Sequence, residues 1–263
     1  MDTIDPAIAL LSPPPPMIHI KARFLEVPKE TFQNLVMPNL LTNDAVKSGT
    51  NTGPDLLTNE KFKAVLRALE QRDGVVALAE PDVTTISGRQ TQMRATQIIN
   101  VVTNIALQEN GTNVSVFPQM EKVETGPILD VIPYVLSDGY TINLAVHPSL
   151  TEFLGYDQPT NTTTVYDKAG EKIDLTKSLP KFQVRQAKAS VNLWDNQTVV
   201  FSGLPEKNYV SGKETVEKSK ASDKELLVFI TVTLVDPTGT RIHVDEELPF
   251  AQKGIPPQPR KPK

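Results

Sequence analysis

Alternation of apolar and polar residues with a period of two is the strongest constraint on how this chain folds. Residues 17–27, "MIHIKARFLEV", place Ile18, Ile20, Ala22 and Phe24 on one face, with polar and charged residues on the other. This pattern predicts a β-strand with one buried face. The same alternation recurs in "YTINLAVH" and "ASVNLW". We therefore expect a core built mainly from strands.

The stretch "ELLVFITVTLV", residues 225–235, is apolar on both faces. A strand of this kind either is buried on both sides or faces lipid on one side. The sequence leaves both alternatives open.

One helix is expected, over about residues 58–73. Thr58 or Asn59 can cap its start, and Gly74 can end it. A single apolar stripe runs along this helix and is formed by Phe62, Val65, Leu66 and Leu69. One clear helix among many candidate strands predicts an α+β fold that is predominantly antiparallel β.

Turn signals predict four hairpins. The turns are Ser87-Gly88-Arg89, residues 109–113, Ser137-Asp138-Gly139 and Asp195-Asn196-Gln197, with the last hairpin covering residues 189–204. By composition, residues 98–108 could form a strand or a helix, and their β-branched residues favour a strand. The hairpin around 109–113 is then expected to be long. By contrast, residues 37–57 and 155–180 are expected to be irregular, and the charged segment 206–224 is expected to be a mobile loop.

Composition bounds the class of protein. The chain has 263 residues, a net charge of −4 and no cysteine. The charge argues against nucleic acid as a partner, and the lack of cysteine excludes disulfides. No apolar run is long enough for a transmembrane helix, and the first 16 residues do not have the pattern of a secretory signal. We expect a Pro-rich linker over 1–16, one folded domain over 17–245, and a disordered, Pro-rich, basic tail over 246–263.

Nothing in the sequence predicts catalysis. The histidines at 19, 147 and 243 are far apart and lack metal-ligand spacing, so we interpret them as polar residues on strands and loops. No nucleophile elbow or phosphate-binding loop occurs. We expect no enzyme activity, no metal and no cofactor.

Several motifs, taken in order, resemble the secretin family, which forms outer-membrane channels of type II and type III secretion and of type IV pilus systems. "IHIKARFLEV", "VVALAEPDVTTISGRQTQMRA" and "KELLVFITVTLV" are similar to three strand-forming segments of that family. "GPILDVIP" keeps a family spacing through Gly126, Leu129, Val131 and Pro133. "PKFQVRQAKASVNLWDNQTVVFSGL" resembles a second family motif, and its matching positions include Pro180, Arg185, Asp195, Gly203 and Leu204.

The resemblance implies long β-hairpins that pair between subunits into a homo-oligomeric ring or barrel. It implies assembly roles for the nine motif residues just named, and a gate formed in part by the hairpin over 97–123. Its partners would be secretion or pilus machinery, a transported protein or pilus, and outer-membrane lipid, with no nucleic acid. The location would be the bacterial outer membrane or the periplasm.

The sequence departs from the family after Leu204. Members usually carry an apolar segment there, whereas residues 205–223 are highly charged here. Two alternatives to a channel therefore stay open. One is a non-conducting, secretin-like scaffold or accessory protein of such a machine. The other is an unrelated β-rich ligand-binding domain.

Overall fold

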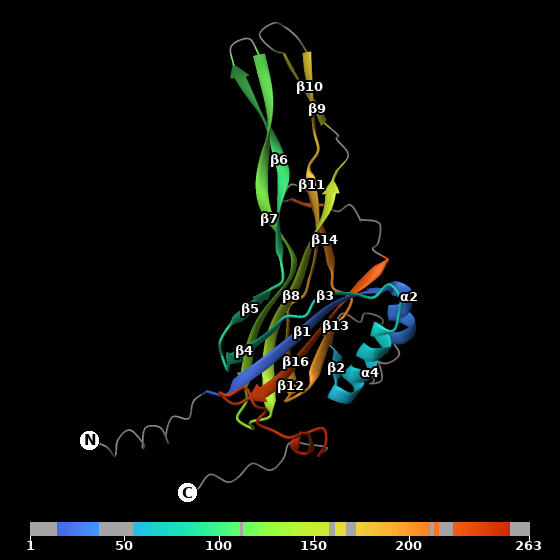
Figure 1. The fold of residues 1–263 in the computed structure, drawn as a ribbon, viewed down its shortest axis with the longest axis vertical. Helices are drawn as coiled ribbons and strands as arrows, with labels where there is room; N and C mark the ends of the chain where they lie inside the picture. The colour runs from blue at the N-terminus through green and yellow to red at the C-terminus, as the bar shows by residue number, and fades with distance from the viewer. Residues whose placement is uncertain are drawn as a thin grey trace, which may run out of the picture.

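In the computed structural model, two β-sheets pack face to face and two long hairpins extend from one end (Figure 1). The structure describes residues 15–36, 55–110, 113–157, 161–166, 172–210, 213–215 and 223–252. The predominantly antiparallel β fold predicted from the sequence is confirmed. No helix among these residues is long and apolar enough to cross a membrane.

A six-stranded sheet is organised around β1 and β16, which pair antiparallel from Met17↔Val235 to Pro28↔Lys224. On the far side of β16 lie β13 and then β2, whereas β3 and β4 both pair with the free edge of β1. The strands are β1 (Met17–Pro28), β2 (Asp55–Leu57), β3 (Val76–Ala79), β4 (Asp82–Ile86), β13 (Thr198–Phe201) and β16 (Lys224–Val235).

The eight-stranded sheet consists of four long antiparallel segments with a short hairpin at one edge. The β5 register Arg94↔Ile128 continues into β6 as Gln97↔Thr125, so β5 and β6 together run along β7. In the same way, β11 and β12 together run along β8. The strands are β5 (Thr91–Arg94), β6 (Gln97–Asn110), β7 (Asn113–Val135), β8 (Thr141–Tyr156), β11 (Pro180–Gln186), β12 (Ala189–Trp194), β14 (Glu206–Val210) and β15 (Lys213–Thr215).

The main hydrophobic core lies between the two sheets. Ile18, Ile20, Ala22 and Phe24 of β1 are all fully buried there, which confirms the predicted alternation. They pack with residues of β7, β8 and β12, since every second residue of those strands points to the same space.

A smaller core lies on the other face of the six-stranded sheet, under α4 (Asn59–Glu70). The predicted helix is present and is capped by Thr58, whose hydroxyl accepts from the Lys61 amide. Phe62 packs on Phe229 of β16 with ring centroids 5.4 Å apart. Because the opposite face of β16 lines the main core, this strand is buried on both sides.

Helical segments that the sequence did not predict follow β1 and β16. A short helix α2 (Lys29–Thr31) leads into the π-helical turn η1 (Phe32–Val36), and the 3₁₀ turn η3 (Asp245–Glu247) lies in the C-terminal segment. Leu248 is fully buried after that turn. Residues 1–14, 37–54 and 253–263 lie outside the described residues, so the expected linker, the loop over 37–54 and most of the tail stay predictions. The last three residues of the loop expected over 37–57 form β2 instead.

Two predicted hairpins are wrong in their pairing. β12 pairs with β8, whereas β13 pairs with β16 and β2, so the chain over 189–204 crosses from one sheet to the other. Likewise β4 pairs with β1 and β5 with β7. A tight turn between two strands does not require those strands to pair with each other, because each can pair along either of its edges. Here the pairing was decided by burial of the apolar face of each strand between the two sheets.

The long hairpin over 97–118 is confirmed, and β7 is longer than expected. Its pairing with β6 reaches Asn110↔Asn113, and the same strand continues through Gly126 to Val135. The segments expected to be irregular over 155–180 and mobile over 206–224 also contain strands. A second hairpin is formed by β9 (Asn161–Tyr166) and β10 (Lys172–Lys177), and β14 pairs with β15.

Candidate functional site

A buried ion cluster joins the two sheets at Arg185. This residue is 2% exposed, and its Nη2 donates to Glu26 of β1 at 2.6 Å and to Glu152 of β8. The ammonium group of Lys224 lies 3.4 Å from the second oxygen of Glu26. Because β1 and β11 belong to different sheets, this cluster ties them together across the core.

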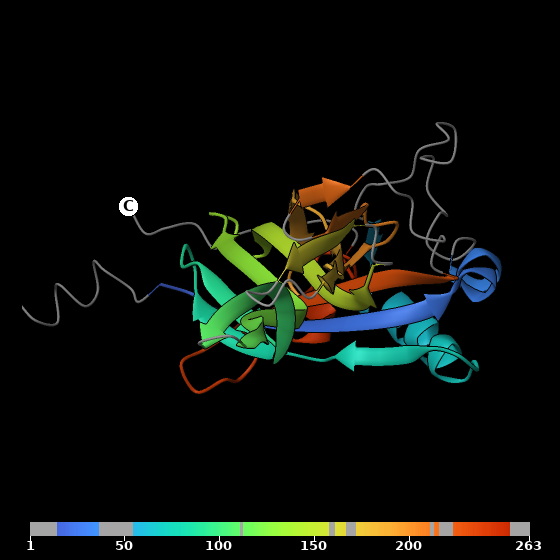
Figure 2. The ribbon, with the colours of Figure 1, turned by 90° about the horizontal axis from the view of Figure 1, so that it is seen from above.

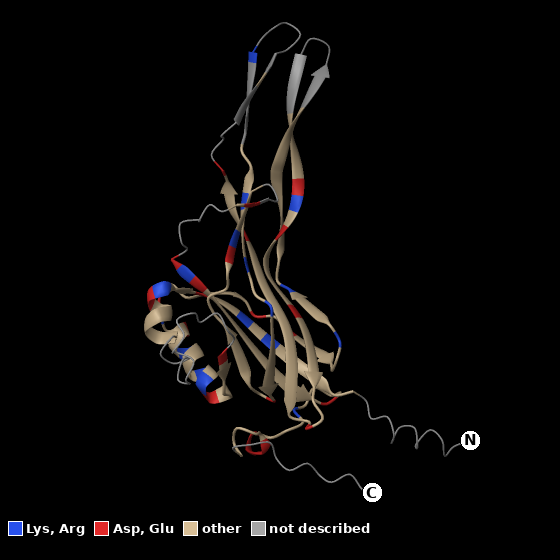
Figure 3. Cartoon of the chain, turned by 180° about the vertical axis from the view of Figure 1, so that it is seen from behind, with Lys and Arg blue, Asp and Glu red and all other residues tan. Residues whose placement is uncertain are grey.

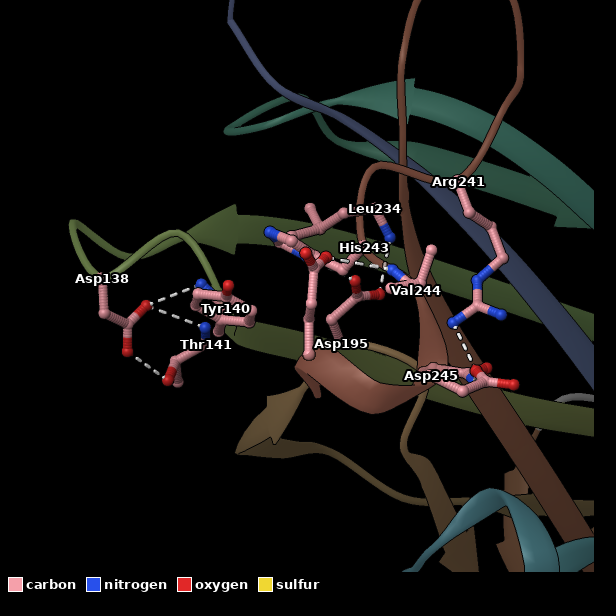
Figure 4. A network of polar contacts seen from close by, with 11 residues as sticks. Asp138, Tyr140, Thr141, Asp195, Leu234, Arg241, His243, Val244 and Asp245 are labelled. Carbon is pink, nitrogen blue, oxygen red and sulfur yellow. Dashed lines mark hydrogen bonds and ion pairs between the residues drawn. The ribbon is translucent and has the colours of Figure 1, made fainter. Parts of the chain in front are cut away.

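The crossing from β12 to β13 is a second junction between the sheets (Figure 4). Asp195 is fully buried, and its carboxylate accepts from the backbone N–H of Leu234 at 2.8 Å. The Asp195 amide donates to the Tyr140 carbonyl, and the Asn196 amide donates to the Val232 carbonyl. Asn196 has a φ of 61°, in the left-handed region, and asparagine tolerates this conformation better than most residues do.

His243 completes this junction from the C-terminal segment. Its Nδ1 lies 2.9 Å from the second oxygen of Asp195, and its ring stacks on Tyr140 with centroids 4.1 Å apart. The sequence interpretation of His243 as an ordinary polar residue missed this role. No spacing signal could have revealed it, because the two partners are 48 residues apart in the chain.

The electrostatics of this junction follow from burial and hydrogen bonding. Burial raises the pKa of Tyr140, and the negative charges of Glu247 and Asp195 raise it further. Burial opposes ionisation of Asp138, but hydrogen bonds from Thr141 and Tyr140 outweigh it and lower the pKa of Asp138. The junction therefore holds Asp138 as an anion and Tyr140 as a neutral phenol.

The other predicted motif residues occupy structural positions. Leu129, Val131 and Leu204 are buried in the main core. Pro133 lies near the end of β7, where its carbonyl accepts from the Gly88 amide, and Pro180 begins β11. Gly203 has a φ of 62° just after β13. The structure thus spreads the nine motif residues over the core and both junctions, and does not bring them into one pocket.

Gly126 marks the point where the β6–β7 hairpin leaves the eight-stranded sheet. Its φ is +120°, and a Cβ atom there would lie 2.8 Å from the carbonyl oxygen of Ala95. A side chain at this position would therefore force the two neighbouring strands apart.

Replacing Gly126 with alanine should lower the free energy of unfolding by about 1–3 kcal/mol, because the new Cβ combines a positive φ with a backbone clash. Denaturant titration measures this loss. Gly239→Ala is the matched control, since Gly239 has a φ of +86° but a Cβ atom added there would meet no other atom within 4 Å. An equal loss in both variants would contradict the clash at Ala95.

The two long hairpins, β6–β7 and β9–β10, are the other candidate functional elements.

Seen from above, the strands gather at the centre, and α2 and α4 lie to one side (Figure 2). From behind, basic and acidic residues are scattered along the strands and α4, with no broad region of one sign on that face (Figure 3). Among the described residues, no cluster of histidine and carboxylate side chains could hold a metal ion.

A family model described as "Secretin: Bacterial type II and III secretion system protein" matches residues 68–217, which is more than half of the chain. The chain belongs to the secretin family. The match runs from the end of α4 through both long hairpins and the crossing at Asp195. No curated protein matches this sequence.

Solved secretins are similar over most of this chain. The type II secretin GspD from enteropathogenic Escherichia coli has 14% identity and a TM-score of 0.40, with 91% of this chain and 75% of that chain covered. GspD in the ETEC pilotin–secretin AspS–GspD complex has 13% identity and a TM-score of 0.40, with coverage of 91% and 54%. The Vibrio cholerae type IV competence pilus secretin PilQ has 13% identity and a TM-score of 0.36, with coverage of 88% and 64%. This secretin-family chain thus spans between about half and three-quarters of their lengths.

After Leu204, where the resemblance led us to expect an apolar segment, this secretin-family domain has a charged sequence. It begins with β14, which pairs with β15 at the edge of the eight-stranded sheet. Lys207 and Glu214 form an exposed ion pair across these strands at 3.1 Å.

Proposed function

We propose that this secretin-family chain is a ring-forming subunit of an outer-membrane channel for protein secretion or for a type IV pilus. The observation that carries the proposal is the family match over residues 68–217, because that range contains both long hairpins. By analogy with the family, the β6–β7 hairpin would contribute to the gate.

The order of the eight-stranded sheet supports a ring. β5 and β15 lie at its two ends, and within the described part of the chain each pairs with one strand only. Unpaired edges at opposite ends of a sheet suit a head-to-tail contact between copies, and a closed ring would leave no edge exposed. Closure would also satisfy the backbone groups of strands placed in lipid.

The remaining parts of the proposal follow from such a ring. Its partners would be further copies of the chain, proteins of the secretion or pilus machinery, the transported protein or pilus, and outer-membrane lipid. It would act in the bacterial outer membrane or the periplasm, without enzymatic activity. The nine motif residues would act in folding and assembly.

A non-conducting scaffold is the second candidate. It is favoured by one observation, the charged β14–β15 hairpin in place of an apolar segment. Family membership removes the third alternative, an unrelated β-rich ligand-binding domain.

Purification in detergent tests the ring directly. We expect a heat- and SDS-resistant oligomer on gels and ring-shaped particles by electron microscopy. A chain that stays a soluble monomer at all concentrations would overturn the proposal. A soluble or peripheral oligomer without conductance in planar bilayers would favour the scaffold.

A shortened hairpin extends the same test to gating. Residues 102–120 can be replaced by Asn-Gly without a change of register, since Val101 pairs with Glu121. The shortened ring should conduct more current than the native ring. The matched control shortens the second hairpin between Asn161 and Lys177, which also pair. Its current should be closer to that of the native ring than the current of the ring with the shortened β6–β7 hairpin.

A further inference from the structure

Four aromatic residues form a row across β8, β11 and β14. Phe153 lies 5.5 Å from Tyr156 and 5.4 Å from Phe182 between ring centroids, and Phe182 pairs in register with Tyr209. A bulge produces this row. The pairing passes from Phe182↔Phe153 to Lys181↔Gly155, so one residue is skipped and Tyr156 comes to the same face as Phe153.

The β6–β7 hairpin lies over this aromatic row. The hydroxyl of Tyr156 accepts from the backbone N–H of Val102 at 2.8 Å, next to a second irregularity in the register, between Val102 and Asn104. This hydrogen bond connects the hairpin to the second pair of long strands, β8 and β11.

Beside this hydrogen bond, a cavity of about 400 Å³ lies between the hairpin and two residues of the row, Phe182 and Tyr209. Its volume is in the range of small-molecule sites. The side chains that line it come from both sides of the gap: Val101, Thr103, Glu121 and Val123 from the hairpin, and Thr151, Pro180, Phe182, Val184 and Tyr209 from the strands opposite.

The chemistry of this lining is that of a site for an amphipathic cation. Most of the surface is aliphatic or aromatic, and Glu121 is the single charged side chain in it. Within the described residues Glu121 makes no ion pair, and it is exposed at the cavity. A carboxylate attracts a cation, aromatic rings such as those of Phe182 and Tyr209 can add to that attraction, and the apolar walls favour an alkyl chain.

We infer that this cavity binds a small amphipathic amine, with its alkyl chain between the hairpin and the aromatic row and its ammonium group at Glu121. A bound amine contacts the hairpin and β11 at once, and therefore holds them together. The binding does not depend on the proposed channel. Only its consequence for gating rests on that function.

The experiment titrates octylammonium, octanol and octanoate into the full chain by isothermal titration calorimetry. Octylammonium should saturate one site per chain, with octanol about tenfold weaker and octanoate weaker still, because only the amine pairs with the carboxylate. Failure of octylammonium to saturate, or equal affinity of octanol, would overturn the inference.

Variants locate the site. Glu121→Gln should weaken octylammonium about tenfold, to the affinity of octanol. Val123→Trp should abolish binding by filling the cavity. Glu60→Gln on α4 removes the same charge far from the cavity and should bind as the native chain does. If Glu121→Gln binds octylammonium with native affinity, the inference is wrong.

Two further measurements keep the outcomes distinct. Circular dichroism checks that each variant is folded, and hydrogen exchange of the Val102 amide should slow when octylammonium is bound. Binding without a ring would leave this inference standing and remove the channel. A ring that does not bind octylammonium would support the channel and overturn the amine site.

Discussion

Replacing Arg185 with alanine should lower the free energy of unfolding by about 3–5 kcal/mol, the cost of removing one partner from a buried ion pair. The guanidinium group is the positive partner of both Glu26 and Glu152. Glu26 is only 12% exposed, so its charge would be left poorly solvated, with the more exposed Lys224 as its remaining cation. Urea titration followed by circular dichroism measures the loss.

A matched control and a rescue test the cause. Lys207→Ala removes a cation from the exposed pair with Glu214, and we expect no measurable change in the unfolding midpoint because surface pairs contribute little. The double variant Arg185→Met, Glu26→Leu should regain much of the lost stability, since apolar residues can replace a buried pair. If Arg185→Ala were as stable as Lys207→Ala, the cluster would not hold the sheets together.

Replacing Asp195 with alanine should have the second largest effect, a loss of about 2–4 kcal/mol in the free energy of unfolding. The buried Leu234 N–H would lose its acceptor, and His243 would lose its partner. Asp195→Asn should fall between the native chain and Asp195→Ala, because the amide oxygen still accepts one hydrogen bond.

A double-mutant cycle separates this junction from general destabilisation. Asp195→Ala and His243→Ala should be non-additive, because the two side chains form one interaction. His19→Ala is the control histidine, since its polar partners within the described part of the chain are Thr84 and Asp82, at the surface. Additive losses for Asp195 and His243 would show that the pair does not couple the C-terminal segment to the crossing.

Much of the strand content could be predicted from local patterns. The alternation in residues 17–27 predicted the buried face of β1, because successive side chains of a strand point to opposite faces. The doubly apolar stretch 225–235 predicted a strand that is either buried on both sides or faces lipid on one side. β16 lies between the main core and α4, so it is buried on both sides. The stripe Phe62, Val65, Leu66 and Leu69 predicted the helix.

The errors lie in polar segments and in pairing. Residues 161–166 and 172–177 form a hairpin although their composition is polar, since strands that extend beyond the core need no apolar face. The contact between His243 and Asp195 could not be predicted from the sequence either, because a hydrogen bond between residues far apart in the chain produces no periodic pattern.

Local sequence patterns therefore specify most of the strands, the position of α4, and the motifs that are those of a secretin. Packing in three dimensions sets which strands pair. Asp195-Asn196-Gln197 is a turn in either arrangement, and its sequence predicted one hairpin. Burial of Leu193 between the sheets, together with the pairing of β13 to β16, sends the two strands into different sheets. The local sequence of a turn determines that the chain reverses direction. Which sheet each strand joins is determined by the free energy of packing between residues far apart in the sequence.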